Sequence, residues 1–176
     1  MNIQQPGSHL DHLVRQTRMN HLQLSQMADV KANMLLTLAS VVITLCLRYL
    51  TDASLRWIAA VLILFCLLTV ILAAYAVMPK TPLKIKRGEQ PDVHSPHFNL
   101  LFFADFLQLS YEDFEAAMEG VMNDHSRAYQ VQLQEVYTSG LFLAKEKYRY
   151  IRLAYLTFIA GLAASGLVAV VSGVLR

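Results

Sequence analysis

Two groups of charged or polar side chains stand where long apolar runs begin, and their residue types are well suited to binding a ligand. The first group is Asp29 and Lys31, which directly precede an apolar run, with Asn33 at the start of that run. A carboxylate beside apolar surface costs free energy unless it is paired or hydrated. Two interpretations stay open: an interfacial ion pair that positions a helix, or part of a polar ligand pocket.

The second group is basic and directly precedes the last apolar run. Lys145, Lys147, Arg149 and Arg152 follow one another within about two helical turns. Attraction to anionic lipid headgroups, worth roughly 1 kcal/mol per basic residue, would explain them. The alternative is a phosphate-bearing ligand, because the planar guanidinium of arginine matches phosphate geometry and two interleaved tyrosines could stack on a base. Under this ligand hypothesis, the candidate binding residues are Asp29, Lys31, Asn33, Lys145, Arg149 and Arg152.

Catalytic and metal-binding patterns are missing from the sequence. It has no phosphate-cradling glycine loop, no cysteine and histidine spacing typical of a metal site, and no nucleophile elbow. His94 and His97 lie three residues apart in a proline-rich stretch, where solvated histidines are favoured over a metal site. Cys46 and Cys66 fall inside apolar runs and are expected to be small apolar fillers. We therefore expect that the protein is not an enzyme and that it binds no metal and no cofactor.

Three apolar runs must position these residues. They span residues 32–50, 57–78 and 153–175, and Arg48 is the one charged residue among them. A helix rises 1.5 Å per residue, so about 20 residues cross a hydrocarbon core of roughly 30 Å. Lipid offers no hydrogen-bond partners, so each run must be helical. The buried helices of a soluble protein would show a polar face, so the sequence predicts an all-α membrane protein with three transmembrane helices.

The distribution of positive charge predicts the orientation of these spans. Of the fifteen Lys and Arg residues, twelve precede the first run or lie between the second and third, which leaves three on the other side. Basic residues concentrate in cytoplasmic segments. We therefore expect a multi-pass protein whose N-terminus and middle segment are cytoplasmic and whose C-terminus faces out.

Long helices are expected to extend two of the spans into a cytoplasmic helical stalk bundle. A capping box at Ser8 and Asp11 would start the first helix, and Asn123 or Asp124 would start another that continues unbroken into the third span. The apolar stripe predicted for this last helix comprises Tyr137, Leu141, Ala144, Tyr148, Ile151 and Tyr155. We expect one unit over residues 1–176, composed of a stalk helix with span 8–50, span 57–78, a cytoplasmic segment 79–152 and span 153–175.

The middle segment changes character along its length. Prolines predict a loop over residues 79–97, and an apolar stretch follows at residues 98–109. Ser110 and Asp113 form a second predicted capping box, which opens a short acidic helix ending at Gly120. Residues 98–118 are expected to supply a packing surface for the stalks.

Small residues recur every four positions in the last apolar run, at Gly161, Ser165, Ala169 and Gly173. Such a ladder allows another helix to approach closely. The partner helix would be a span of the same chain or of another protomer, and we expect a homo-oligomer.

Three motifs in order resemble the Pycsar transmembrane effector family. Residues 28–36 (ADVKANMLL) are similar to its Ala-Asp-x-Lys-Ala motif before the first span, and Phe102, Phe103 and residues 109–114 (LSYEDF) to its middle segment. Residues 145–155 (KEKYRYIRLAY) resemble its Lys-Tyr-x-x-Leu-Arg-x-Ala stretch. The resemblance extends from about Leu24 to Gly161.

That resemblance implies an effector of the bacterial inner membrane that defends against phage. A partner cyclase would make cyclic CMP or cyclic UMP on infection, and the effector would sense this cyclic pyrimidine nucleotide and impair the membrane. The implied partners are membrane lipid and a cyclic mononucleotide, and no nucleic acid polymer. No β-rich nucleotide-binding domain is visible, so the ligand would bind the stalk helices or a subunit interface. The alternative is a membrane scaffold whose stalk recruits a cytoplasmic protein through residues 98–106 and 112–119.

Overall fold

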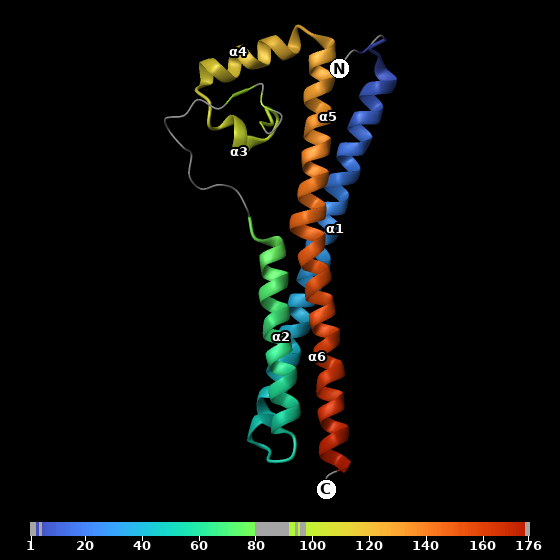
Figure 1. Ribbon diagram of the computed structural model, residues 1–176, viewed down its shortest axis with the longest axis vertical. Coiled ribbons are helices and arrows are strands. Elements are labelled where there is room, and N and C mark those ends of the chain that lie inside the picture. The colour runs from blue at the N-terminus through green and yellow to red at the C-terminus, as the bar shows by residue number, and fades with distance from the viewer. Residues whose placement is uncertain (1–2, 4, 80–91, 94, 96–97, 175–176) are drawn as a thin grey trace. The chain divides into compact units, whose positions relative to one another are not determined.

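The computed structural model describes residues 3, 5–79, 92–93, 95 and 98–174 (Figure 1). These residues form helices and turns, and no strand occurs among them. The predicted all-α class is therefore confirmed. Most of the predicted loop at residues 79–97 lies outside the described residues, as do His94 and His97.

Three helices are long and apolar enough to cross a membrane. They are α1 (Ser8–Leu47), α2 (Arg56–Val77) and the stretch that ends with α6 (Arg149–Val174). Each contains one of the predicted spans, apart from residues at their ends. The first run departs from the predicted helix where Arg48–Thr51 tightens into a 3₁₀ turn, in which the Arg48 guanidinium lies 4.8 Å from the Tyr49 ring centre.

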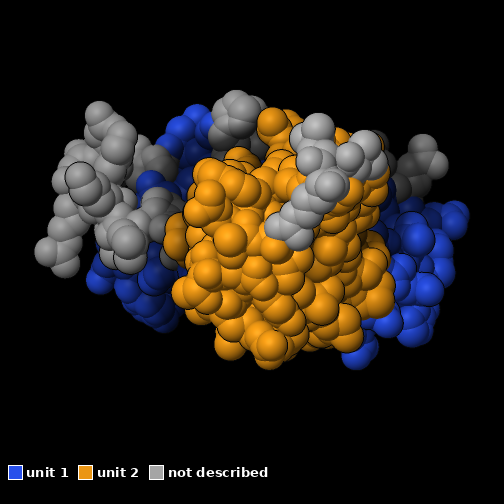
Figure 2. Space-filling model, turned by 90° about the horizontal axis from the view of Figure 1, so that it is seen from below, with its two compact units in different colours: residues 1–23, 79–142 blue, residues 24–78, 143–176 orange. Residues whose placement is uncertain are grey.

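The chain divides into two compact units, coloured separately in Figure 2. We call residues 24–78 and 143–176 the apolar unit, and residues 1–23 and 79–142 the polar unit. Helix α1 contributes residues to both units. The expected single unit over residues 1–176 stays a prediction.

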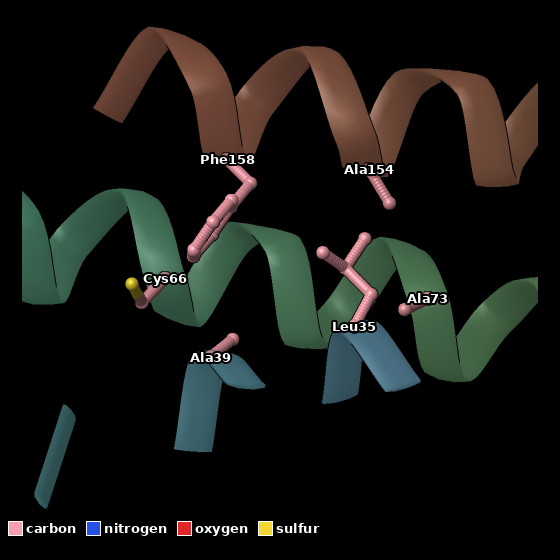
Figure 3. Close-up of a cluster of buried hydrophobic side chains, with 6 residues drawn as sticks. All are labelled: Leu35, Ala39, Cys66, Ala73, Ala154 and Phe158. Carbon is pink, nitrogen blue, oxygen red and sulfur yellow. The ribbon is translucent and has the colours of Figure 1, made fainter. Parts of the chain in front are cut away.

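The core of the apolar unit is built largely from small side chains on three helices (Figure 3). Leu35 and Phe158 fill the space that these small residues leave, because close-packed interiors tolerate few voids. The buried cluster comprises Leu35 and Ala39 of α1, Cys66 and Ala73 of α2, and Ala154 and Phe158 of α6. Cys66 is a free, buried thiol, as expected of an apolar filler.

Large apolar side chains point outward from all three of these helices. Examples are Leu38, Leu45, Leu64, Ile71, Leu167 and Val170, all of which are exposed. An aqueous surface rarely carries so much contiguous apolar area, whereas lipid tails are as apolar as leucine. The outward faces therefore fit contact with lipid.

The polar unit contains α3 (Phe103–Phe106), α4 (Tyr111–Met122) and α5 (His125–Phe142). Phe98 and Leu100 are buried with Val121 of α4, and Ala128 and Val131 of α5 pack against them. The segment that begins at Phe98 thus supplies a packing surface for α5, as predicted.

A buried asparagine fixes the segment at Phe98 onto α5. The side chain of Asn99 donates hydrogen bonds to Glu135 Oε2 at 2.5 Å and to Thr138 Oγ1 at 2.9 Å. The side-chain oxygen Oδ1 of Asn99 accepts from the backbone N–H of Leu101 at 3.0 Å. Its own backbone N–H donates to Asp105 Oδ2 at 2.9 Å. Every polar group named here has a partner, which is what makes a buried polar side chain tolerable.

All three predicted helices begin where expected, and two of the three predicted side-chain caps are confirmed. The hydroxyl oxygen of Ser110 accepts from the backbone N–H of Asp113 at 3.1 Å at the start of α4. Asp124 Oδ1 accepts from the backbone N–H groups of Ser126 and Arg127 at 2.9 and 3.3 Å at the start of α5. Both bonds satisfy N–H groups that have no partner inside the helix.

The capping box predicted at Ser8 and Asp11 is wrong. The carbonyl of Gly7 accepts from the N–H groups of Leu10 and Asp11 at the start of α1. Asp11 Oδ1 instead accepts a 2.6 Å hydrogen bond from the hydroxyl of Tyr129 on α5. A long-range partner thus replaces the local one, because the carboxylate gains a buried donor.

The last long helix contains a feature that the sequence did not predict. Between α5 and α6, residues Leu143–Tyr148 form a π-helical segment, called the π-segment below. The helix therefore continues but changes its winding. The predicted apolar stripe is wrong at four of its residues, since Tyr137, Leu141, Ala144 and Tyr155 are exposed, while Leu143 and Ala154, which lie outside the stripe, are buried. A π turn holds more residues than an α turn, so it shifts which residues share a face.

Candidate functional site

The π-segment carries a lysine that pairs with one of the predicted site residues. Lys147 Nζ lies 2.8 Å from Asp29 Oδ1 and 2.9 Å from Asp29 Oδ2 on α1. It also donates to Ser25 Oγ at 2.8 Å. Ser25 and Asp29 are four residues apart, so they share one face of α1. The three N–H groups of the ammonium thus face three acceptor oxygens.

Burial is unequal across this ion pair. The Lys147 side chain is 14% exposed and that of Asp29 is 41% exposed. A lysine held away from water needs both an opposite charge and hydrogen bonds, and Asp29 with Ser25 supplies them. The ion pair therefore positions the π-segment against α1, as the first interpretation of Asp29 expects, while a role of Asp29 in ligand binding stays a prediction.

Small and aromatic residues surround the pair. Ala28 and Ala32 of α1 are fully buried against Ala76 and Ile151. The ring of Tyr150 meets that of Tyr75 edge to face, with centres 4.5 Å apart. Tyr148 donates to the carbonyl of Leu24 at 3.3 Å. Both tyrosines that could stack on a base are thus engaged in packing against α1 and α2.

The other predicted ligand residues lie on the surface of the apolar unit. Lys31, Asn33, Lys145, Arg149 and Arg152 are all exposed. Within the part of the chain that the structure describes, their side chains form no hydrogen bond or ion pair. The structure therefore does not gather the six residues into one enclosed pocket. It presents four exposed cations, which suit an anionic ligand or anionic lipid headgroups.

Sequence reasoning missed two members of this site. The sequence predicts Lys147 as one of four basic residues but not as the partner of Asp29, and it predicts no role for Ser25. The spacing of Ser25 and Asp29 marks a polar face on α1. The choice of Lys147 over Lys145 depends on the winding of the π-segment, which periodicity does not report.

The small-residue ladder of α6 has different neighbours along its length. A methyl group added to Gly161 would overlap the Cβ of Phe65 on α2, so that glycine allows close contact within the chain. Ser165 is buried and Ala169 is half-buried. Nothing lies within 4 Å of the position that a Cβ would take at Gly173. The partner helix of Gly161 is therefore the second span of the same chain.

Comparison with known proteins identifies the family. A model described as the Pycsar effector protein domain matches residues 12–174, nearly the whole chain. Neither the curated proteins nor the solved structures contain a match. Among the described residues there is no group of three potential metal ligands, and the family is in general not one of enzymes. The chain therefore belongs to the Pycsar effector family, membrane proteins that act as cyclic-nucleotide-linked effectors in defence against phage.

Proposed function

We propose that cyclic CMP or cyclic UMP activates this protein, which then disrupts the integrity of the bacterial inner membrane. The observation that carries the proposal is the family match, because it spans residues 12–174 and so includes the helices that can cross a membrane. The N-terminus and the middle segment would be cytoplasmic, where a partner cyclase releases its product.

Activation requires that the ligand bind one conformation better than another, since a ligand shifts an equilibrium only by that difference. The π-segment is a suitable place for the change, because π turns are rare and occur frequently at functional sites. A change in its winding would act on Lys147 and on the start of α6 at Arg149. Exposed small residues of α6, such as Gly173, would then serve packing in a homo-oligomer.

The exposed basic residues have two roles under this proposal. Lys31, Lys145, Arg149 and Arg152 are available to lipid phosphates, with roughly 1 kcal/mol expected per residue near an anionic surface. The same cations, with Asp29 and Asn33, also remain the sequence-based candidate for nucleotide binding.

Dye release from liposomes tests the proposed function directly. Purified protein is reconstituted in dye-loaded vesicles, and cyclic CMP, UMP, AMP and GMP are added separately. We expect one cyclic pyrimidine nucleotide to cause leakage, while protein-free vesicles stay intact. If vesicles that contain inserted protein retain their dye with all four nucleotides, the proposal fails.

A scaffold is the second candidate function, and the surface of α4 favours it. Its residues Glu112 and Glu115 are exposed, and Tyr111 and Met122 at its two ends are each 71% exposed. An acidic helix with exposed apolar ends suits a basic cytoplasmic protein. Absence of leakage together with stable capture of such a protein by the intact chain would favour this function.

A further inference from the structure

The polar unit contains a cavity that lies apart from the Asp29–Lys147 ion pair in sequence. Its volume is about 330 Å³, and it lies between the segment at Phe98, the end of α4 and the first turns of α5. Pockets for small molecules typically measure about 300–1,000 Å³. The cavity is therefore near the lower limit for a ligand site, which suits one small molecule.

One wall of the cavity is polar. Arg127, Gln130 and Gln134 line it from α5. Their spacing of three and four places them on one helical face. Gly120 of α4 leaves room for the arginine, since a Cβ there would lie 3.2 Å from Arg127 Nη1. This face offers one cationic fork and two amide side chains that both donate and accept hydrogen bonds.

Buried apolar side chains from other segments also line the cavity. Phe98, Leu100 and Val121 line it and are all buried. Gln134 Nε2 donates to the carbonyl of Phe98 at 2.8 Å, which ties the polar wall to the segment at Phe98. The aromatic ring and the two aliphatic side chains provide a surface for a flat ring, and the arginine in the same lining provides a partner for an anion.

We propose that this cavity binds the cyclic pyrimidine mononucleotide that activates the protein. The inference rests on the proposed function and names the site for it. Arg127 would hold the cyclic phosphate, and Gln130 and Gln134 would bond to the edge of the pyrimidine. The cavity volume favours a mononucleotide over cyclic dinucleotides, which are about twice as large.

A carboxylate in the lining limits the charge of the ligand. Asp124 lies in the cavity wall, and its Oδ1 caps the start of α5. It would repel additional negative charge near Arg127. The cyclic phosphodiester carries one charge, whereas linear CMP carries about two at neutral pH. Linear CMP and UMP should therefore bind less tightly than their cyclic forms.

Calorimetric titration of the full chain in detergent micelles tests the site. The probes are cyclic CMP, cyclic UMP, linear CMP and a cyclic dinucleotide. Arg127→Gln is compared with Arg149→Gln, which removes an equivalent charge from the exposed set in the apolar unit. We expect Arg127→Gln to weaken cyclic nucleotide binding roughly 10- to 100-fold, because a hydrogen bond to a charged group is lost. Arg149→Gln should stay within about twofold.

The outcomes separate this site from the proposed function. Wild-type protein that binds no cyclic pyrimidine nucleotide would overturn both. Wild-type binding that Arg127→Gln leaves unchanged, or that only Arg149→Gln removes, would overturn the cavity while the proposed function stands. If Arg127→Gln does not fold, Gln130→Ala decides instead, since Gln130 is exposed and the substitution should preserve the helix. It should weaken binding about threefold to tenfold, and unchanged affinity would overturn the site.

Discussion

The Lys147 ammonium lies within 2.9 Å of both carboxylate oxygens of Asp29, and these two residues are 118 positions apart in the sequence. This contact joins α1 to the π-segment. Asp29 is the aspartate of the Ala-Asp-x-Lys-Ala motif, so this motif residue has a structural partner in Lys147. A change in the winding of the π-segment would alter this ion pair, which links the local helix geometry to the proposed activation.

Removal of Asp29 should destabilise the protein more than removal of Lys147. Asp29→Ala leaves a lysine side chain that is 14% exposed without its counter-charge, whereas Lys147→Ala leaves a carboxylate that is 41% exposed and can be hydrated. An unsatisfied, mostly buried group costs about 1–3 kcal/mol. Thermal unfolding in micelles, followed by circular dichroism, measures both variants.

The double variant provides the control for this ion pair. If the two side chains interact directly, the effects of Asp29→Ala and Lys147→Ala will not add, and the difference is their coupling energy. Lys145→Ala, which removes an exposed lysine two residues away, should change the melting temperature little. Additive effects of the two substitutions would show that the ion pair contributes nothing.

Gly161→Ala should destabilise the apolar unit, because the added methyl group would overlap Phe65 of α2. Overpacking of this kind costs about 1–3 kcal/mol. Gly166→Ala is the matched control, since nothing lies within 4 Å of the added carbon. Thermal unfolding in micelles compares the two. Equal melting temperatures would mean that the two helices do not pack as closely as the structure has them.

Much of the fold could be predicted from hydropathy alone. Uncharged runs of about 20 residues have few alternatives in lipid, so the positions of the three spans followed from the sequence. Local capping at Ser110 and Asp124 was also predictable, because a cap involves residues two or three positions apart. The cap at Ser8 was not, because Asp11 instead accepts from Tyr129, which is distant in the sequence.

The candidate site was predictable only as a pair of polar regions. Charge at the edge of an apolar run predicts a polar region at Asp29 and another at the basic group before α6. The pairing itself depended on helix phase, and the π-segment changes that phase in a way that a 3.6-residue period cannot anticipate. The cavity beside Arg127 was missed, because it forms where the segment at Phe98 folds back on α5. Such long-range contacts leave no periodic signal.

Asn99→Ala should destabilise the polar unit. The substitution removes a donor from Glu135 and Thr138 and an acceptor from the Leu101 N–H group. Buried groups that lose their partner cost about 1–3 kcal/mol each. Limited proteolysis and thermal unfolding should both report the loss, and cyclic nucleotide binding should weaken because Phe98 and Leu100 line the cavity.

Asn123→Ala is the control for that substitution. Asn123 is exposed at the end of α4, and such surface changes usually stay within about 0.5 kcal/mol. Equal stability of the two alanine variants would contradict the role assigned to the Asn99 hydrogen bonds.

The stability of the polar unit should fall as the pH rises above 10, and Tyr129 should account for part of that fall. Its hydroxyl donates to Asp11 Oδ1, and this hydrogen bond, with burial and the nearby negative charge, raises the pKa of Tyr129 above 10.0. The raised pKa means that the folded state binds the proton more tightly than the unfolded state does. The stabilisation is therefore complete below pH 10 and is lost as the pH rises through the raised pKa.

The Tyr129→Phe variant tests this pH dependence, because it removes both the hydrogen bond to Asp11 and the titration of the hydroxyl. We expect it to lower the melting temperature at pH 8, and the difference in melting temperature from wild type should narrow as the pH rises above 10 through the raised pKa of Tyr129. Tyr137→Phe, at an exposed position, should follow wild type throughout. A gap for Tyr129→Phe that stays constant or widens above pH 10 would contradict the assigned role of the hydrogen bond to Asp11.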